Sequence, residues 1–154
     1  MLTRLNASSR IHCYQFDNYF SANQISVTYR PPSSIWFFQL CNGGMFGSPR
    51  LLTALLRRFY WHIWVPLKRL LALLLVPFYD LIFVERGLLQ HCSRPWLEHL
   101  LFLQAKMWRK KVVYFIDDAI YLDCPGYVNS VLSQADVIIT VNKFLARYVA
   151  DHNP

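Results

Sequence analysis

The chain has 154 residues, of which 55% are hydrophobic and 16% charged, and its formal net charge is +7. Disordered chains have the opposite balance, so this composition excludes disorder and predicts one domain with its own hydrophobic core. It contains no zinc-finger spacing, aromatic RNA-binding motif or basic region followed by heptads, and we therefore predict no nucleic-acid partner.

The N-terminal third begins with a helix signal. A serine pair at positions 8 and 9 can cap a helix over residues 10–20. Residues 25–29 alternate and are β-branched, which predicts a strand. Residues 30–50 contain prolines, serines and a glycine pair, which predicts an irregular loop. Because only residues 1–5 remain for a strand ahead of the serine pair, the first strand of the sheet is expected to be incomplete.

A long helical tract follows over residues 51–76, and we expect it to be kinked or broken at Pro66. The most hydrophobic run, residues 70–84, is shorter than the roughly 20 residues that span a bilayer, so no transmembrane span is predicted. The tract mixes cations with interfacial aromatic residues, which suits either an anionic bilayer face or a core helix with a solvated basic edge. The candidate membrane-surface residues are Arg57, Arg58, Trp61, Trp64, Lys68 and Arg69.

The C-terminal half alternates between strand and helix signals. Residues 79–84, 111–116 and 136–141 are continuous apolar runs, which predict strands buried on both faces of a parallel sheet. Helical patterns separate them, with Ser93 as one predicted cap and Asn142 as the cap of a helix over residues 143–150 that buries Phe144, Leu145 and Tyr148. The predicted fold class is therefore α/β, a Rossmann-like open parallel sheet with helices on both faces.

Polar residues follow the predicted strands, where ligands bind in an open parallel sheet. Asp117 and Asp118 directly follow an apolar strand, and placing two carboxylates side by side there costs free energy unless they serve a purpose. Asn142, by contrast, could be only a helix cap. The residues predicted to line the crevice at these strand ends are Arg10, Glu85, Arg86, Asp117, Asp118, Tyr121 and Asn142.

Several segments resemble group 1 glycosyltransferases. They are YDLIFVERGLL at 79–89, PWLE at 95–98, KVVYFIDDAIY at 111–121, QADVIITVNKFLARYV at 134–149 and DHNP at 151–154, with ASSR at 7–10 near the start. The resemblance implies a GT-B architecture in which residues 1–154 form the N-terminal, acceptor-side lobe. The intact enzyme would transfer a sugar from a nucleotide-sugar donor to a glycan or lipid-linked acceptor.

The resemblance also sets expectations for ligands and partners. The donor is expected to bind mainly a missing second domain, so the lobe uses no cofactor or metal and is inactive alone. Asp117 and Asp118 would hydrogen-bond an acceptor hydroxyl or position a loop, and Arg10 would meet a phosphate; no catalytic residue is assigned. The implied partners are the acceptor, an anionic membrane surface and a separate donor-binding half. The implied location is the cytoplasm, peripheral on the inner face of the membrane.

Other interpretations compete with this one. Phosphatases and receiver domains need acids at other spacings, whereas a membrane-surface or interaction module without catalytic activity remains an alternative.

Four widely spaced cysteines without a CxxC pair predict reduced thiols, and the histidines show no metal spacing. A second basic cluster lies just before the run at 111–116, and a basic excess of this kind can mean nucleic acid, an anionic lipid or a phosphate-bearing ligand. It comprises Lys106, Arg109, Lys110 and Lys111.

Overall fold

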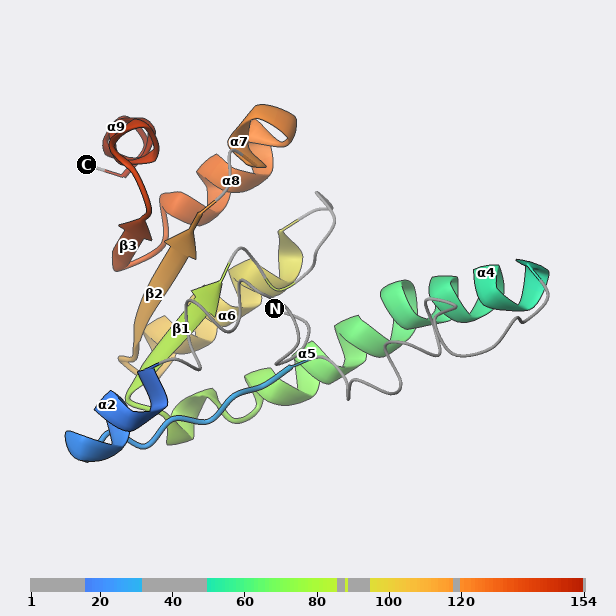
Figure 1. Cartoon of the computed structure of the whole chain (residues 1–154), viewed down its shortest axis with the longest axis horizontal. Coiled ribbons are helices and arrows are strands. Elements are labelled where there is room, and N and C mark those ends of the chain that lie inside the picture. Colours follow the sequence, from blue (N-terminus) through green and yellow to red (C-terminus); the bar gives the residue numbers. More distant parts are fainter. Residues whose placement is uncertain (1–15, 32–49, 86–87, 89–94, 118–119, 154) are drawn as a thin grey trace. The chain divides into compact units, whose positions relative to one another are not determined.

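The computed structural model divides the chain into two compact units, Met1–Lys68 and Arg69–Pro154 (Figure 1). It describes residues 16–31, 50–85, 88, 95–117 and 120–153. The predictions made for Arg10, Arg86, Ser93 and Asp118 lie outside these described residues, as does nearly all of the loop predicted over residues 30–50.

In the first unit, helix α2 (Asp17–Ala22) ends in a tight turn. The N–H of Asn23 donates to the carbonyls of Tyr19 and Phe20 at 3.1 and 3.2 Å, and Gln24 follows with a positive φ of 59°. The helix predicted over residues 10–20 is thus found nearer the C-terminal side, and residues 10–15 lie outside the described part.

The strand predicted over residues 25–29 is wrong. The segment has no regular structure, and Ile25 and Val27 are exposed. A strand has to pair its backbone groups with a neighbour, and no described segment pairs with this one. The Tyr29 hydroxyl instead donates to the Asp17 carboxylate, which ties the segment back to α2.

The long helical tract is confirmed, but its irregularity differs from the prediction. Helix α4 (Arg50–Phe59) continues into the π-helix η2 (Tyr60–Trp64) and then into α5 (Val65–Leu73). The N–H of Val65 donates to the Tyr60 carbonyl, one residue further back than in an α-helix. Pro66 lies in the first turn of α5, where its missing N–H is tolerated. The irregular turn is therefore the π-helix just before the proline, and the helix does not break at the proline itself.

In the second unit, the 3₁₀ turn η3 (Val76–Phe78) leads into an open sheet of three parallel strands. The strands β1 (Leu81–Glu85), β2 (Lys111–Ile116) and β3 (Val137–Thr140) pair in the order β1-β2-β3. Helices α6 (Trp96–Met107), α7 (Ile120–Asp123), α8 (Pro125–Leu132) and α9 (Lys143–Ala150) lie between and after them. The predicted α/β class with a parallel sheet is confirmed (Figure 1).

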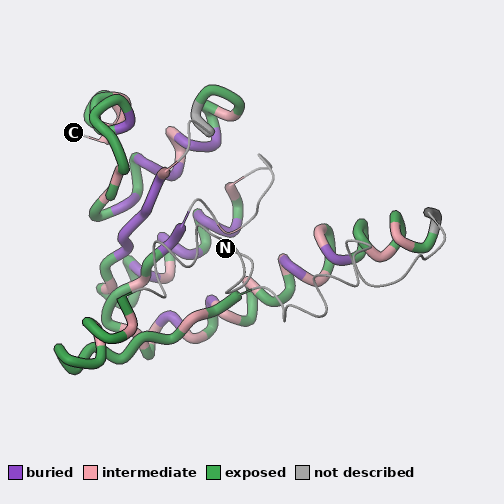
Figure 2. The backbone as a smooth tube through the Cα atoms, in the orientation of Figure 1, coloured by how far each residue is buried: buried purple, intermediate pink, exposed green. Residues whose placement is uncertain are grey.

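One face of this sheet carries the core of the unit. Alternate residues of a strand point to opposite faces, and Val84, Val112, Tyr114 and Ile116 share one of them. All four are buried in one cluster with α6 and α8 side chains. Figure 2 shows β2 buried along most of its length, as expected for a central strand.

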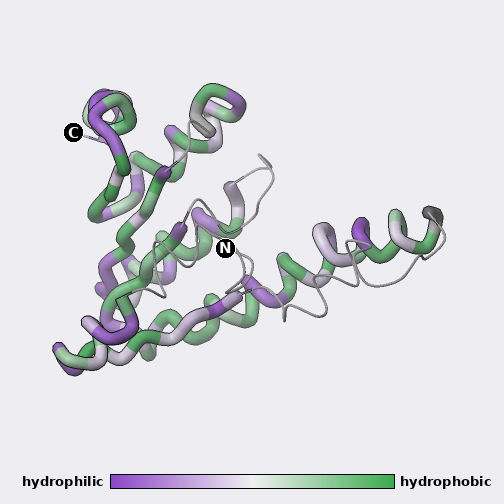
Figure 3. The backbone as a smooth tube through the Cα atoms, in the orientation of Figure 1, coloured by the Kyte–Doolittle hydropathy of each residue, from purple (hydrophilic) through white to green (hydrophobic). Residues whose placement is uncertain are grey.

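The other face is apolar but only partly covered, which contradicts the prediction of strands buried on both faces. Leu81 and Phe83 of β1 are 54% and 41% exposed, and Val137 and Ile139 of β3 are 49% and 42% exposed. The rings of Phe83 and Phe115 stack across the strands at a centroid distance of 6.0 Å. Only β2 matches the prediction, because it has a neighbouring strand on each side. Figure 3 shows that the three strands are mostly hydrophobic in sequence.

The helices that follow β1 and β3 begin in different ways. Pro95 occupies the N-cap of α6 and makes no side-chain cap bond. Asn142 caps α9 as predicted: its Oδ1 accepts from the N–H groups of Phe144 at 3.0 Å and Leu145 at 2.9 Å. Leu145 is buried, but Phe144 is 66% exposed, so the predicted burial of Phe144 is wrong.

Two further predictions concern membranes and cysteines. Among the described residues, no helix combines the length and the apolar character needed to cross a bilayer. Cys124 is disulfide-bonded, so the prediction of reduced thiols is wrong for this cysteine. The other three cysteines lie outside the described residues.

Candidate functional site

The ends of the three strands bring polar residues to one edge of the sheet, which we call the carboxyl edge. Glu85 ends β1, Asp117 directly follows β2 and Asn142 lies just beyond β3. Glu85 is opposite Phe115, and Ile116 is opposite Thr140, so the three polar residues lie on consecutive strands near the same level. The sequence predicted this gathering from the strand ends alone.

The three residues differ in their surroundings. Glu85 is 6% exposed and Asp117 is half-buried, whereas Asn142 is exposed. The amide oxygen of Asn142 is occupied by the two N–H groups of the α9 cap. Tyr121 lies in α7, but its side chain is outside the described part, as are Arg10, Arg86 and Asp118.

A buried carboxylate links segments next to the carboxyl edge. Glu98, in the first turn of α6, is only 1% exposed. Its Oε1 accepts a hydrogen bond from the N–H of Leu88 at 2.8 Å and another from the hydroxyl of Tyr127. One side chain thereby connects the segment after β1 to helices α6 and α8. The Oε2 atom of Glu98 is buried without a hydrogen-bond partner in the described part of the chain.

This carboxylate changes the titration of two buried tyrosines. Burial raises the pKa of Tyr127 far above its usual value of 10, and the charge and hydrogen bond of Glu98 raise it further. Burial also raises the pKa of Tyr114, with smaller contributions from the negative charges of Glu98 and Asp117. Both tyrosines therefore remain neutral hydrogen-bonding groups at physiological pH, and neither is poised as a general base.

The sequence interpretation assigned no role to Glu98, although a signal was present. Glutamate is common in the first turn of a helix, where it complements the helix dipole, so its presence there does not by itself indicate a special role. However, the buried side of α6 contains Glu98 among apolar residues at helical spacing, and a charged residue within such a stripe indicates a buried polar contact. Leu100 and Leu103 of the same helix are exposed. The buried residues of α6 are Leu97, Glu98, Leu101, Phe102 and Ala105.

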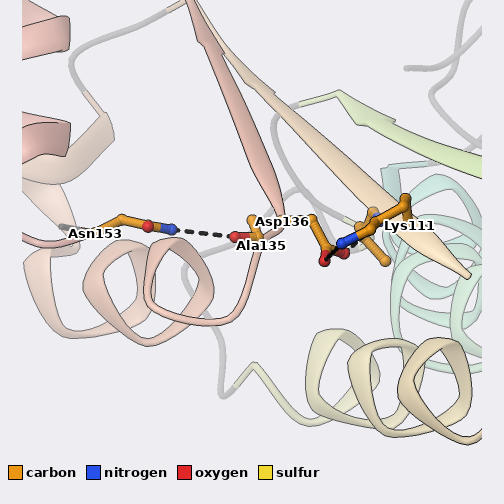
Figure 4. A network of polar contacts seen from close by, with 5 residues as sticks. Lys111, Ala135, Asp136 and Asn153 are labelled. Carbon is orange, nitrogen blue, oxygen red and sulfur yellow. Dashed lines mark hydrogen bonds and ion pairs between the residues drawn. The ribbon is translucent and has the colours of Figure 1, made fainter. Parts of the chain in front are cut away.

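At the opposite, amino edge of the sheet, a charge pair fixes the start of two strands (Figure 4). The ammonium group of Lys111 lies 2.9 Å from Oδ1 of Asp136, and the N–H of Val112 donates to Oδ2 at 2.8 Å. The hydrogen bonds of Lys111 and Val112 hold the pKa of Asp136 below its usual range. Asn153 donates to the carbonyl of Ala135 at 3.1 Å and anchors the residue before Asp136.

The first unit contains most of the candidate membrane-surface residues. Arg57, Arg58 and Lys68 are exposed on the helical tract, and Trp61 and Trp64 are half-buried. The ammonium group of Lys68 lies 5.0 Å from the ring centre of Trp64, a cation–π contact. No acidic residue occurs between positions 50 and 79, so the basic charge of α4 and η2 is not compensated within that stretch of sequence.

Arg69, the remaining membrane-surface candidate, belongs to the second unit and has a structural contact. It is half-buried, and its Nε donates to the carbonyl of Leu88 at 3.2 Å. Leu88 therefore bonds to Arg69 through its carbonyl and to Glu98 through its N–H. These two hydrogen bonds fix Leu88, so Arg69 contributes to the fold of the second unit.

Within residues 16–31, 50–85, 88, 95–117 and 120–153, no group of three or more histidine, cysteine, aspartate or glutamate side chains is arranged to hold a metal ion.

Comparisons with known proteins add no assignment to this geometry. No protein-family model matches the sequence, and neither curated proteins nor solved structures gave a match.

Proposed function

We propose that this chain is the acceptor-side lobe of a two-domain GT-B glycosyltransferase, built on a Rossmann-like open parallel sheet. The observation that supports this best is the gathering of Glu85, Asp117 and Asn142 at the carboxyl edge. Ligands of open parallel sheets bind outside this edge. Carboxylates accept hydrogen bonds from hydroxyl groups, which are the main functional groups of a glycan.

In this proposal the lobe binds and orients the acceptor, whereas a second domain supplies the nucleotide sugar. Asp117 is the strongest candidate for contact with the acceptor, because it is half-buried at the end of the central strand. Asn142 contributes mainly by starting α9, since its oxygen is used in the cap. Glu98 acts indirectly by holding Leu88 and Tyr127, and with them the segments around the site.

Ligand-observed NMR on the purified chain tests the proposal. Acceptor oligosaccharides and prenyl-phosphate-linked sugars are compared with nucleotide sugars under the same conditions. We expect an acceptor sugar to bind and nucleotide sugars to bind weakly or not at all. Asp117→Asn should weaken sugar binding, whereas Asp151→Asn, a matched change at the exposed C-cap of α9, should not.

Two results would overturn the proposal. Absence of binding by every saccharide would remove the acceptor site, provided that circular dichroism shows the folded protein. Nucleotide-sugar binding stronger than acceptor binding would instead identify a donor-side lobe. In either case the assignment of Asp117 to an acceptor contact would be withdrawn.

A second candidate function is attachment to an anionic membrane surface. It is favoured by exposed apolar residues on α4 and η2, namely Leu52, Leu55, Phe59 and Ile63, that recur at intervals of three or four next to exposed Arg57 and Arg58. This surface is compatible with a lipid-linked acceptor and with a peripheral location on the inner face of a membrane. Co-sedimentation with anionic liposomes that falls as salt rises would support it, and no co-sedimentation would exclude it.

A further inference from the structure

A hollow lies at the amino edge of the sheet, on the side of the second unit opposite the candidate acceptor site. It is bounded by the C-terminal half of α6, the start of β2 and the turn before β3. Its volume is about 810 Å³, within the roughly 300–1,000 Å³ typical of small-molecule sites. We call it the amino-edge hollow.

The lining of this hollow is strongly basic. Lys106, Arg109, Lys110 and Lys111 all contribute to it. Lys111 is paired with Asp136 at 2.9 Å, and Lys110 lies 3.9 Å from a fully exposed Asp80 carboxylate. Lys106 and Arg109 are exposed and form no ion pair with any described residue. Two positive charges therefore remain uncompensated at one concave surface.

Arg109 occupies a backbone position that normally selects glycine. Helix α6 ends in a Schellman motif, in which the N–H of Lys110 donates to the Ala105 carbonyl at 2.8 Å and the N–H of Arg109 to Lys106 at 3.2 Å. Arg109 has a φ of 52°, in the left-handed region. Glycine adopts this conformation without a steric penalty from a Cβ atom, so the arginine side chain is present at a cost to the fold.

The uncharged polar side chains that line one wall of the hollow are fixed by hydrogen bonds. The side-chain amide of Gln134 donates to the Ser130 carbonyl at 2.6 Å and lies 2.8 Å from Nδ1 of His99. Because an amide N–H donates, Nδ1 is the acceptor and the His99 proton lies on Nε2, which faces the Ser130 hydroxyl at 3.1 Å. These contacts use the amide N–H groups of Gln134, so the lysine and arginine side chains are the charged donors on the lining that remain for an anionic ligand.

We propose that the amino-edge hollow binds a phosphate-bearing small molecule, with Arg109 and Lys106 as its principal contacts. More than one uncompensated positive charge suits a dianion, and the planar fork of arginine matches two phosphate oxygens. The site goes beyond the proposed acceptor function and uses none of its residues. An alternative account is that Lys106 merely complements the C-terminal dipole of α6, but this does not explain an arginine at a left-handed position.

Titration calorimetry with inorganic pyrophosphate tests the proposal on the full chain, at about 0.15 M salt, where long-range attraction is screened. We expect Arg109→Gly to weaken binding about tenfold or more, the loss of one charge-assisted contact. The same variant should leave the Tm unchanged or raise it, because glycine fits the left-handed backbone. Arg109→Gln keeps the strained backbone but removes the charge, and it should lose affinity to a similar extent.

The matched control is Arg147→Gln, which removes one exposed charge from α9 and should keep wild-type affinity within about twofold. The proposal is overturned if Arg109→Gly binds pyrophosphate like wild type, or if Arg147→Gln is weakened equally, because the attraction would then be unspecific. Stronger binding of a single-stranded oligonucleotide than of pyrophosphate would also overturn the small-molecule assignment.

A further arm of the experiment identifies the source of the phosphate. If pyrophosphate displaces the chain from vesicles containing phosphatidic acid, and Arg109→Gly reduces vesicle binding, the phosphate of a lipid headgroup is the ligand chemistry. If pyrophosphate binds but leaves vesicle binding unchanged, the ligand is soluble. Asp117→Asn should not alter pyrophosphate binding, which separates failure of this site from failure of the acceptor site.

Discussion

Replacing Glu98 by alanine tests how far the carboxyl edge depends on one buried carboxylate. The substitution removes the acceptor of two hydrogen bonds, from the Leu88 N–H and the Tyr127 hydroxyl. The Tyr127 hydroxyl remains in a buried environment, because Tyr127 is 7% exposed and Glu98 itself 1%, whereas Leu88 is half-buried. A water molecule therefore has little room to replace the carboxylate unless the site opens.

The magnitude follows from these two donors. A buried donor left without a partner costs about 1–3 kcal/mol, and the half-buried Leu88 N–H costs less than that, so the two together cost roughly 2–5 kcal/mol. Removing a buried charge returns part of its desolvation cost, since Oε2 of Glu98 has no partner in the described part of the chain. We therefore expect a net destabilisation of the second unit of about 2–4 kcal/mol. This corresponds to a fall in Tm of roughly 10–20 °C for a unit of this size.

Native-state hydrogen exchange of the β2 amides, read by mass spectrometry of peptides from that strand, measures the stability of the second unit separately from the first. Leu103→Ala is the matched control, because Leu103 is 57% exposed on the same helix. Glu98→Gln should retain most of the stability, since its amide oxygen can accept both hydrogen bonds. If Glu98→Ala changes the exchange of β2 no more than Leu103→Ala does, the carboxylate does not support the carboxyl edge.

Two other predictions concern the same unit. Asn142→Ala should destabilise α9 by about 1 kcal/mol through loss of its cap and speed hydrogen exchange at Phe144 and Leu145, and unchanged exchange at both amides would show that the cap is dispensable. The raised pKa values of Tyr114 and Tyr127 mean that the folded state holds their protons more tightly than the unfolded chain does, whose tyrosines titrate near 10. Their contribution to stability is therefore complete below pH 10 and lost as the pH rises above it, so the Tm should fall steeply there; a Tm that stays constant well above pH 10 would contradict the buried, neutral state of these hydroxyls.

The sheet was largely predictable because its strands are continuous apolar runs. The observed bounds of β2 match the predicted run, and β1 and β3 lie within about two residues of theirs. The prediction that β1 and β3 are buried on both faces was wrong, because a run of apolar residues does not reveal which strand is central in the sheet. The strand predicted over residues 25–29 failed for a related reason: local alternation favours a strand, but pairing requires a partner elsewhere in the chain.

The candidate site was predictable where it depends on chain order and not where it depends on distant contacts. Glu85, Asp117 and Asn142 meet at one edge because parallel strands align their carboxyl ends. Glu98 was missed, since its partners Leu88 and Tyr127 are 10 and 29 residues away in sequence. The amino-edge hollow was similarly hidden, although its basic cluster was visible in the sequence.

The order of the strands has a consequence for how the second unit can be assembled and altered. Each strand pairs with its neighbour in sequence, with Leu81 opposite Lys111 and Val113 opposite Val137. The segment that connects β1 to β2 and the segment that connects β2 to β3 are similar in length, so the entropy costs of closing the two loops differ little. Assembly can therefore add one strand at a time, with β2 as the template on which β1 and β3 both form. New strands added beyond β1 or β3 would leave both existing pairs intact, whereas any strand placed between them would require a pair to open.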